Sequence, residues 1–181
     1  MRTLIITFFL LVGLNATSQD YLTRNGSISF SSHTPLEDVQ ANNNEVVSLI
    51  NSATGAMDFK VALKSFHFKK QAMEDHFNDP EYIDSEKYPK AGFSGKITNL
   101  ADVNFTKDGT YDVTVEGNLT IKDVTKPVSI KGTIIVGNGK VTAKAAFSVK
   151  RKEYHVIGES FTESKIEQDI HINVNCVYDK R

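Results

Sequence analysis

Hydrophobic and polar residues alternate with a period of two along most of the chain, which is the pattern of a β-strand with one buried face. From Tyr111 to Ile121 the odd positions are apolar or glycine and the even positions are polar. The alternation recurs from Met57 to Leu63, from Val128 to Val136, from Val141 to Val149 and from Ile166 to Cys176. Each segment predicts a strand whose apolar face other strands must cover.

The whole pattern predicts about eight long strands. They span residues 27–32, 36–50, 57–68, 91–106, 110–122, 127–137, 140–150 and 165–177, with bends in the second and fourth. Asn138-Gly139 predicts a two-residue type I′ turn, and Asp123–Lys126 predicts a four-residue loop. Such short connections make neighbouring strands antiparallel, and eight strands can close into a barrel wide enough for a ligand. We therefore expect an all-β fold, a single antiparallel eight-stranded barrel.

One segment, residues 69–90, interrupts the alternation. It begins with a short helical stretch, Gln71–Phe77, and continues irregularly. In a barrel we expect this segment to cover one open end with the side chains of Met73, Phe77, Tyr82 and Tyr88. The alternative is a surface excursion that fills a gap in the core. Residues 151–164 form a second irregular stretch.

The N-terminus has the plan of a secretory signal peptide. Arg2 supplies positive charge, Thr3–Leu14 is largely apolar, and Ala16 and Ser18 provide small residues at a cleavage site. The apolar run is short for a membrane span. We expect residues 1–18 to be removed, leaving residues 19–181 as one domain in the periplasm or outside the cell, not membrane-spanning after cleavage.

Composition and charge narrow the functional classes. The chain has 181 residues, 40% of them hydrophobic and 24% charged, as in an ordinary globular protein. Because 21 Lys and Arg face 22 Asp and Glu, there is no basic excess for binding nucleic acid. The single cysteine, Cys176, excludes an intramolecular disulfide framework, and its place on an apolar face predicts a buried thiol.

Motifs for catalysis or metal binding are absent from the sequence. No two of the five histidines have the spacing of a helical metal site, and there is no Gly-x-Ser-x-Gly elbow. Acidic residues gather between Asp75 and Glu86, where a solvated loop is the simplest interpretation. We therefore expect a protein that is not an enzyme and carries no metal or cofactor, apart from a bound lipid.

The apolar strand faces allow two interpretations: they pack on one another, or they line a lumen. A lumen would suit a lipid, because each buried CH₂ contributes about 0.8 kcal/mol without any polar contact. With a four-residue loop at 123–126, Gly117 would face Gly132. With the turn at Asn138-Gly139, Gly132 would face Ala145, so that small residues form a row. That row would either leave room for a lipid chain or mark close strand approach. The residues expected to line the pocket are Phe59, Val61, Leu63, Phe93, Val115, Gly117, Leu119, Ile130, Gly132, Ile134, Ala143, Ala145, Phe147, Ile170 and Ile172.

Several motifs together resemble the YceI-like family across the region after residue 18. They are Gly26–Ser32, Ser65–Lys69, His76-Phe77, Ser85–Phe93 and Gly117–Val128. The chain departs from the family pattern at Glu153–Gly158, where His155 stands at a position that is usually glycine; this departure concerns the pocket mouth. The resemblance implies a periplasmic or secreted lipocalin-like barrel that holds a polyisoprenoid or similar long amphiphile.

We therefore expect a non-catalytic carrier or scavenger, present as a monomer or homodimer. Its partner would be a hydrophobic small molecule such as a polyisoprenoid, a quinone or a fatty-acid-like lipid. The alternative from another class is an exported structural or stress-related interaction module whose barrel is filled by its own side chains.

Overall fold

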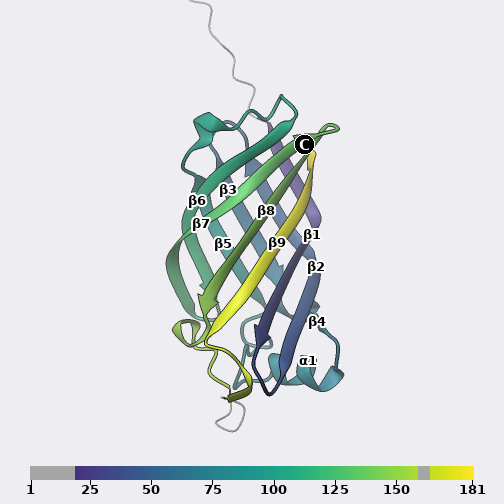
Figure 1. Ribbon diagram of the computed structural model, residues 1–181, viewed down its shortest axis with the longest axis vertical. Helices are drawn as coiled ribbons and strands as arrows, with labels where there is room; N and C mark the ends of the chain where they lie inside the picture. The colour runs from purple at the N-terminus through teal and green to yellow at the C-terminus, as the bar shows by residue number, and fades with distance from the viewer. Residues whose placement is uncertain (1–18, 159–163) are drawn as a thin grey trace, which may run out of the picture.

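Eight long antiparallel strands close into a barrel in the computed structural model, which describes residues 19–158 and 164–181 (Figure 1). Strand β1 pairs with both β2 and β9, and this double pairing closes the sheet. The expected all-β barrel is therefore confirmed. The long strands are β1 (Asp20–His33), β2 (Asp38–Asn51), β3 (Ala56–Ala62), β5 (Lys90–Ile97), β6 (Gly109–Ile121), β7 (Val124–Gly137), β8 (Lys140–Lys150) and β9 (Asp169–Lys180).

Short elements lie in the connections between the long strands. The two-residue strand β4 (His67–Phe68) pairs with β2 next to the helix α1 (Gln71–Asn78). The connections also contain the short 3₁₀ helices η1 (Leu63–Ser65), η2 (Leu100–Asp102) and η3 (Arg151–Tyr154). In Figure 1, α1 and the connection that contains η3 lie at the lower end of the barrel.

Two predicted strands are longer than the real ones. The prediction for 57–68 covers β3, η1 and β4, because the chain turns at Leu63, whose N–H donates to the carbonyl of Pro89 at 3.0 Å. The prediction for 91–106 covers β5 and a connection. Beyond Ile97 the Asn99 side chain replaces strand pairing, since it accepts from the Thr114 N–H and donates to the Asp112 carbonyl.

The predicted loop at 123–126 is wrong. Strands β6 and β7 are joined by the two-residue turn Lys122-Asp123, in which Lys122 adopts a left-handed backbone with φ 53°. Consequently Gly117 faces Val128 and Gly132 faces Val113. The predicted row through Gly117 and Gly132 does not exist.

The other predicted turn is confirmed. Asn138 and Gly139 both have positive φ, 52° and 73°, as a type I′ turn requires. Gly137 therefore faces Lys140, and Gly132 faces Ala145 as expected. Asn and Gly tolerate this conformation better than other residues, which is why the sequence signals this turn.

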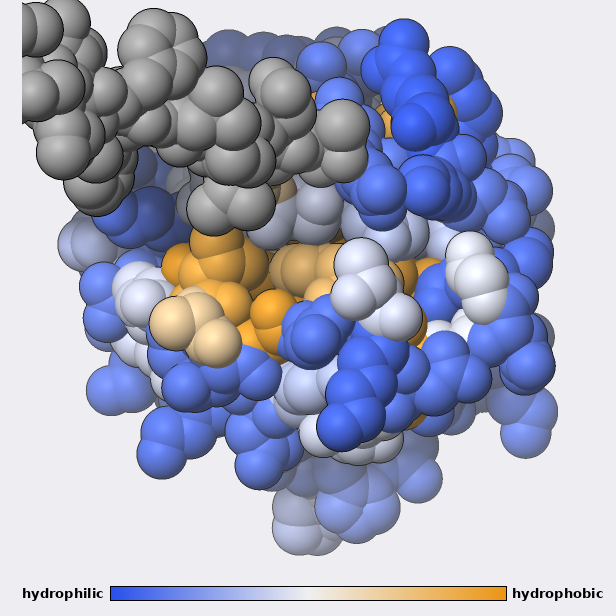
Figure 2. All heavy atoms as spheres, turned by 90° about the horizontal axis from the view of Figure 1, so that it is seen from above, coloured by the Kyte–Doolittle hydropathy of each residue, from blue (hydrophilic) through white to orange (hydrophobic). Residues whose placement is uncertain are grey.

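Packed side chains close the upper end of the barrel. Leu100, Val103 and Phe105, from the connection between β5 and β6, pack against the core. The ring of Tyr21 stacks on Phe105 with ring centroids 5.6 Å apart. Figure 2 looks onto this end and shows apolar residues inside a hydrophilic rim. The space for a ligand therefore lies further down the barrel.

Candidate binding cavity

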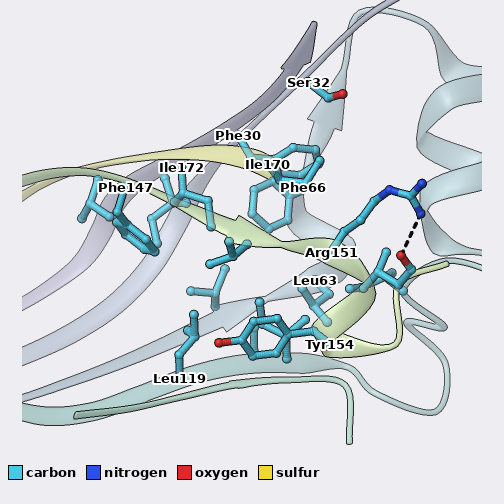
Figure 3. Close-up of a pocket in the computed structure, with 18 of the residues that line it drawn as sticks. Phe30, Ser32, Leu63, Phe66, Leu119, Phe147, Arg151, Tyr154, Ile170 and Ile172 are labelled. Atoms are coloured by element: carbon cyan, nitrogen blue, oxygen red, sulfur yellow. Dashed lines mark hydrogen bonds between the residues drawn. The ribbon is translucent and has the colours of Figure 1, made fainter. Parts of the chain in front are cut away.

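A cavity of about 510 Å³ occupies the middle and lower part of the barrel (Figure 3). All eight long strands contribute to its wall, because the inward side of each strand is mainly apolar. The volume falls in the usual range for pockets that hold small molecules. The barrel is thus hollow in this part rather than filled by its own side chains.

Fourteen of the fifteen residues expected to line a pocket border this cavity. They are Phe59, Val61, Leu63, Phe93, Val115, Leu119, Ile130, Gly132, Ile134, Ala143, Ala145, Phe147, Ile170 and Ile172. Alternation alone places them there, since residues two apart on a strand share a face. Whether they contact a lipid is part of the proposal below.

Gly117, the fifteenth, lies outside the lining because the wall is closely packed around it. It faces Gly95 on β5, and a Cβ at Gly117 would lie 2.5 Å from the Gly95 Cα and 2.7 Å from Cζ of Phe93. The Phe93 ring therefore occupies the space that side chains at 95 and 117 would need. This is the close-approach interpretation of a strand glycine.

Small residues also border the cavity on the neighbouring strands. Gly132 on β7 faces Ala145 on β8, and Ala143 follows two residues along the same face. Gly132 lets these two strands approach closely, because a Cβ there would lie 2.6 Å from the Lys144 carbonyl oxygen. A larger residue at 145 would project into open space, which makes this position a test of the cavity.

Two covering segments, residues 63–89 and 151–158, lie over the lower opening, which we call the mouth. From the first, Met73, Phe77 and Tyr82 border the cavity as expected of a cover, whereas Tyr88 lies outside the lining. Phe77 anchors α1 in an aromatic cluster with Phe30, Phe66 and Phe68, at ring-centroid distances of 5.2–5.7 Å. A carboxylate oxygen of Glu74 also accepts from the Phe68 N–H at 3.1 Å.

The second covering segment is built around Arg151, which is only 4% exposed. Its Nε donates to the carbonyl of Glu167 at 3.0 Å, and its Nη1 donates to the carbonyls of Val156, at 3.1 Å, and Ile157. Figure 3 shows Arg151 reaching from the cavity wall into this loop. A buried guanidinium thus fixes the loop by binding main-chain oxygens from both of its sides.

The two covering segments are also joined to each other. The Lys122 ammonium donates to the carbonyls of Tyr82 and His155, at 2.6 and 3.2 Å, and the Gly158 N–H donates to the Glu81 carbonyl at 2.9 Å. His155 has φ 56°. The position where the family usually has glycine therefore requires the conformation that glycine adopts most easily.

Most of the charged residues in the lining lie at the mouth. Five of them come from connections at this end: Glu37, Lys70, His76, Arg151 and Lys165. Lys70 forms an ion pair with Glu37 at 3.3 Å. Lys144, on β8, borders the cavity beside Gly132 and is exposed to solvent. The cavity thus has an apolar interior and a polar entrance, which suits an amphiphile with its chain inside.

Sequence reasoning missed Ser32, Arg151 and Tyr154 as parts of the wall. All three are buried and border the cavity. Ser32 accepts a hydrogen bond from the Glu167 N–H at 2.8 Å, and so holds the residues just before β9 against β1. The sequence offers one signal for Arg151 and Tyr154, namely a cation and an aromatic residue directly after a strand. The burial of Arg151, however, cannot be deduced from the residues next to it in the sequence.

The described residues show little reactive chemistry. Within residues 19–158 and 164–181, no three His, Cys, Asp or Glu side chains form a group that could hold a metal ion. Cys176 is buried as expected, and burial raises the pKa of its thiol to about 11. In the same part of the chain, no helix has the length and apolar character needed to cross a bilayer.

A model of the YceI-like domain matches residues 22–178, and the chain belongs to this family. Among curated proteins, a UPF0312 protein of Enterobacter sp. strain 638 is 25% identical over 136 residues, which is 72% of this chain and 66% of the relative. A UPF0312 protein of Pseudomonas putida is 30% identical over 125 residues, which is 65% of this chain and 59% of the relative. The chain therefore spans slightly less than two thirds of these relatives.

Solved structures share the fold. A polyisoprenoid binding domain from Saccharophagus degradans, implicated in plant cell wall breakdown, superposes with a TM-score of 0.76 at 12% identity, covering 90% of this chain and 98% of that one. BcnA of Burkholderia cenocepacia has a TM-score of 0.71 at 18% identity, covering 84% of this chain and 95% of that one. At these identities the similarity concerns the barrel architecture.

Proposed function

We propose that the protein is an exported, non-catalytic carrier that holds a polyisoprenoid or a similar long-chain lipid in its barrel. The observation that carries the proposal is the apolar cavity of about 510 Å³, with ionisable groups gathered at its mouth. The barrel of Saccharophagus degradans described as polyisoprenoid binding supports the proposal through its common fold.

The energetics favour an apolar chain over a polar ligand. Each methylene group transferred from water into the cavity contributes about 0.8 kcal/mol, so a long prenyl chain binds without specific polar contacts. A charged group in the apolar interior would cost several kcal/mol unless it were paired. We therefore place the chain of the ligand between Phe59, Phe93 and Phe147, and its polar end at the mouth.

The alternative, an interaction module with a filled barrel, has less support. Such a barrel would have large side chains where this one has Ala143 and Ala145. The hollow wall therefore favours the carrier.

Extraction of the purified protein with organic solvent, followed by mass spectrometry, tests the carrier proposal. We expect about one lipid per chain, or uptake of one when prenyl lipids are offered to empty protein. Protein that stays empty in the presence of prenyl lipids, quinones and fatty acids would contradict the proposal.

Export is a separate part of the proposal. Its support is the charged start, the apolar run and the small residues before Gln19, all of which lie outside the described residues. We expect the exported protein to begin at Gln19. An intact mass that retains residues 1–18 on exported protein would contradict export with cleavage, whatever the lipid result.

A further inference from the structure

Tyr154 brings a hydroxyl group into the apolar wall of the cavity. The residue is only 3% exposed and borders the cavity. Figure 3 shows its ring extending from η3 toward the interior, with the hydroxyl oxygen at the inner end. A tyrosine whose ring only filled space in this wall would need no hydroxyl, since phenylalanine has the same apolar surface.

In the part of the chain that the structure describes, the Tyr154 hydroxyl has no hydrogen-bond partner. The buried hydroxyl of Tyr178, by contrast, lies 2.8 Å from Oγ of Ser48, and the hydroxyl of Tyr111 donates to the Lys107 carbonyl at 2.9 Å. A hydroxyl in an apolar wall that has no protein partner leaves a hydrogen bond to be made with whatever occupies the cavity. Burial also raises the pKa of Tyr154, so at neutral pH the group keeps its proton and can donate.

The turn that carries Tyr154 is held from several directions. Arg151, three residues earlier, binds the carbonyls of Glu167 and Val156. The His155 carbonyl, one residue later, accepts from the Lys122 ammonium at 3.2 Å. Because the Tyr154 side chain is already ordered before binding, a ligand that accepts its hydrogen bond causes little further loss of conformational entropy.

We propose that the Tyr154 hydroxyl donates a hydrogen bond to an oxygen atom of the bound lipid. The inference rests on the proposed carrier function and narrows its ligand class. The ligand is then not a pure hydrocarbon but a long apolar chain with an acceptor oxygen, such as a carbonyl or phosphoryl oxygen. Because Tyr154 belongs to a covering segment, this oxygen lies toward the mouth and the chain extends toward Phe59 and Phe93.

Three probes of matched chain length test the inference. They are geranylgeranylacetone, which carries a ketone, the hydrocarbon of the same length without the carbonyl, and geranylgeranyl monophosphate. Their affinities are measured for the wild type, for Tyr154→Phe and for Tyr111→Phe. The last variant is the matched control, because it removes a hydrogen-bonded hydroxyl at the far end of the barrel.

We expect Tyr154→Phe to weaken binding of an oxygen-bearing probe by about 3- to 10-fold, the effect of one hydrogen bond, and to leave hydrocarbon binding unchanged. Tyr111→Phe should change none of the affinities. A loss for the ketone identifies a carbonyl as a suitable acceptor, and a loss for the monophosphate identifies a phosphoryl oxygen. Equal affinities of wild type and Tyr154→Phe for both oxygen-bearing probes would overturn the inference while the carrier function stands.

Infrared spectroscopy gives a second readout that does not depend on a folded variant. In the wild type, a hydrogen bond from Tyr154 should move the ketone stretch of bound geranylgeranylacetone to lower frequency than in an apolar solvent. The inference would be overturned if the band were unshifted and the wild type bound both oxygen-bearing probes no more tightly than the hydrocarbon. If the wild type bound none of the three probes, the carrier proposal would be contradicted, and so would the inference that rests on it.

Discussion

The Nζ atom of Lys122 lies 2.6 Å from the main-chain carbonyl oxygen of Tyr82. Lys122 belongs to the turn between β6 and β7, and Tyr82 belongs to the first covering segment. Since the same ammonium also reaches the His155 carbonyl, one side chain joins the barrel wall to both covers. Lys122 itself does not border the cavity, so it contacts the covers from outside the lining.

Replacing Lys122 with Met should loosen the cover. The variant keeps the length of the side chain but loses both charge-assisted hydrogen bonds, and we expect the free energy of unfolding to fall by about 1–2 kcal/mol. Lipid should also leave faster, because residues 79–85 and 155–157 open more often. Stopped-flow release of a fluorescent fatty acid and hydrogen exchange of these two stretches measure the effects.

Lys126→Met is the matched control. It breaks the solvent-exposed pair with Glu153, which should cost well under 1 kcal/mol. If both variants released lipid at the wild-type rate, Lys122 would not hold the cover.

Ala145→Phe should fill the cavity. The side chain of Ala145 borders the open space opposite Gly132, so a phenyl ring enters the volume that we assign to the lipid. We expect a folded protein that has lost most of its lipid binding, with a stability change of no more than about 1–3 kcal/mol. Circular dichroism and extraction with mass spectrometry give the two readouts.

The neighbouring position provides the control for this experiment. Ala146 is exposed on the outer face of the same strand, and Ala146→Phe should leave lipid binding intact. Undiminished binding in Ala145→Phe would show that the lipid lies elsewhere.

Gly117→Ala should destabilise the barrel, because residue 117 lies outside the cavity lining but packs against the β5 main chain and the Phe93 ring. The new methyl group would lie 2.4 Å from the Ser94 carbonyl oxygen, a distance that the two strands must increase. We expect a loss of about 1–3 kcal/mol in urea unfolding. Gly137→Ala is the control, because nothing lies within 4 Å of a Cβ at that position, and its stability should change little.

Stability should fall in alkaline solution because of Cys176. Burial raises the pKa of this thiol to about 11 from 9.0, so between these values the native protein keeps a proton that the unfolded chain releases. The stabilisation is complete below pH 9 and declines as the pH rises to 11, by about 2–3 kcal/mol at most. Burial also raises the pKa of Tyr178, which adds to the decline above pH 10.

Urea unfolding at pH 8, 9, 10 and 11 measures this dependence. Cys176→Ala should be less stable at pH 8, where it loses a buried group, but should show a smaller decline toward pH 11. Equal slopes in the wild type and in Cys176→Ala would contradict the assignment to the thiol.

The barrel could be predicted from the sequence because a strand with one buried face and one exposed face has apolar and polar residues in alternation. This period of two can be read directly from the residue types. The sequence also placed Asn138-Gly139 correctly, since these residues favour positive φ. The turn at Lys122 escaped prediction because lysine carries no such signal. What holds it is a long-range contact with the covering segments, which only the folded chain reveals.

The residues of the candidate site fall into the same two groups, those that a local sequence pattern predicts and those that it does not. Strand periodicity placed residues such as Phe59 and Ile134 on the cavity wall, and Gly117 was misplaced only because the backbones of two strands approach each other there. Arg151 and Tyr154 were missed because their roles come from a loop conformation. Loop conformation depends on hydrogen bonds between residues far apart in sequence, and no local period encodes them.

Closure of the barrel through β1 and β9 brings its first and last strands together, and the Arg181 N–H donates to the Asp20 carbonyl at 2.8 Å. Both lie at the upper end of the barrel, opposite the mouth (Figure 1). A fluorescent protein, an affinity tag or a surface linker joined to either of these strands would stand a full strand length away from the entrance. The protein can therefore be immobilised through these strand ends while the mouth of the cavity stays unobstructed.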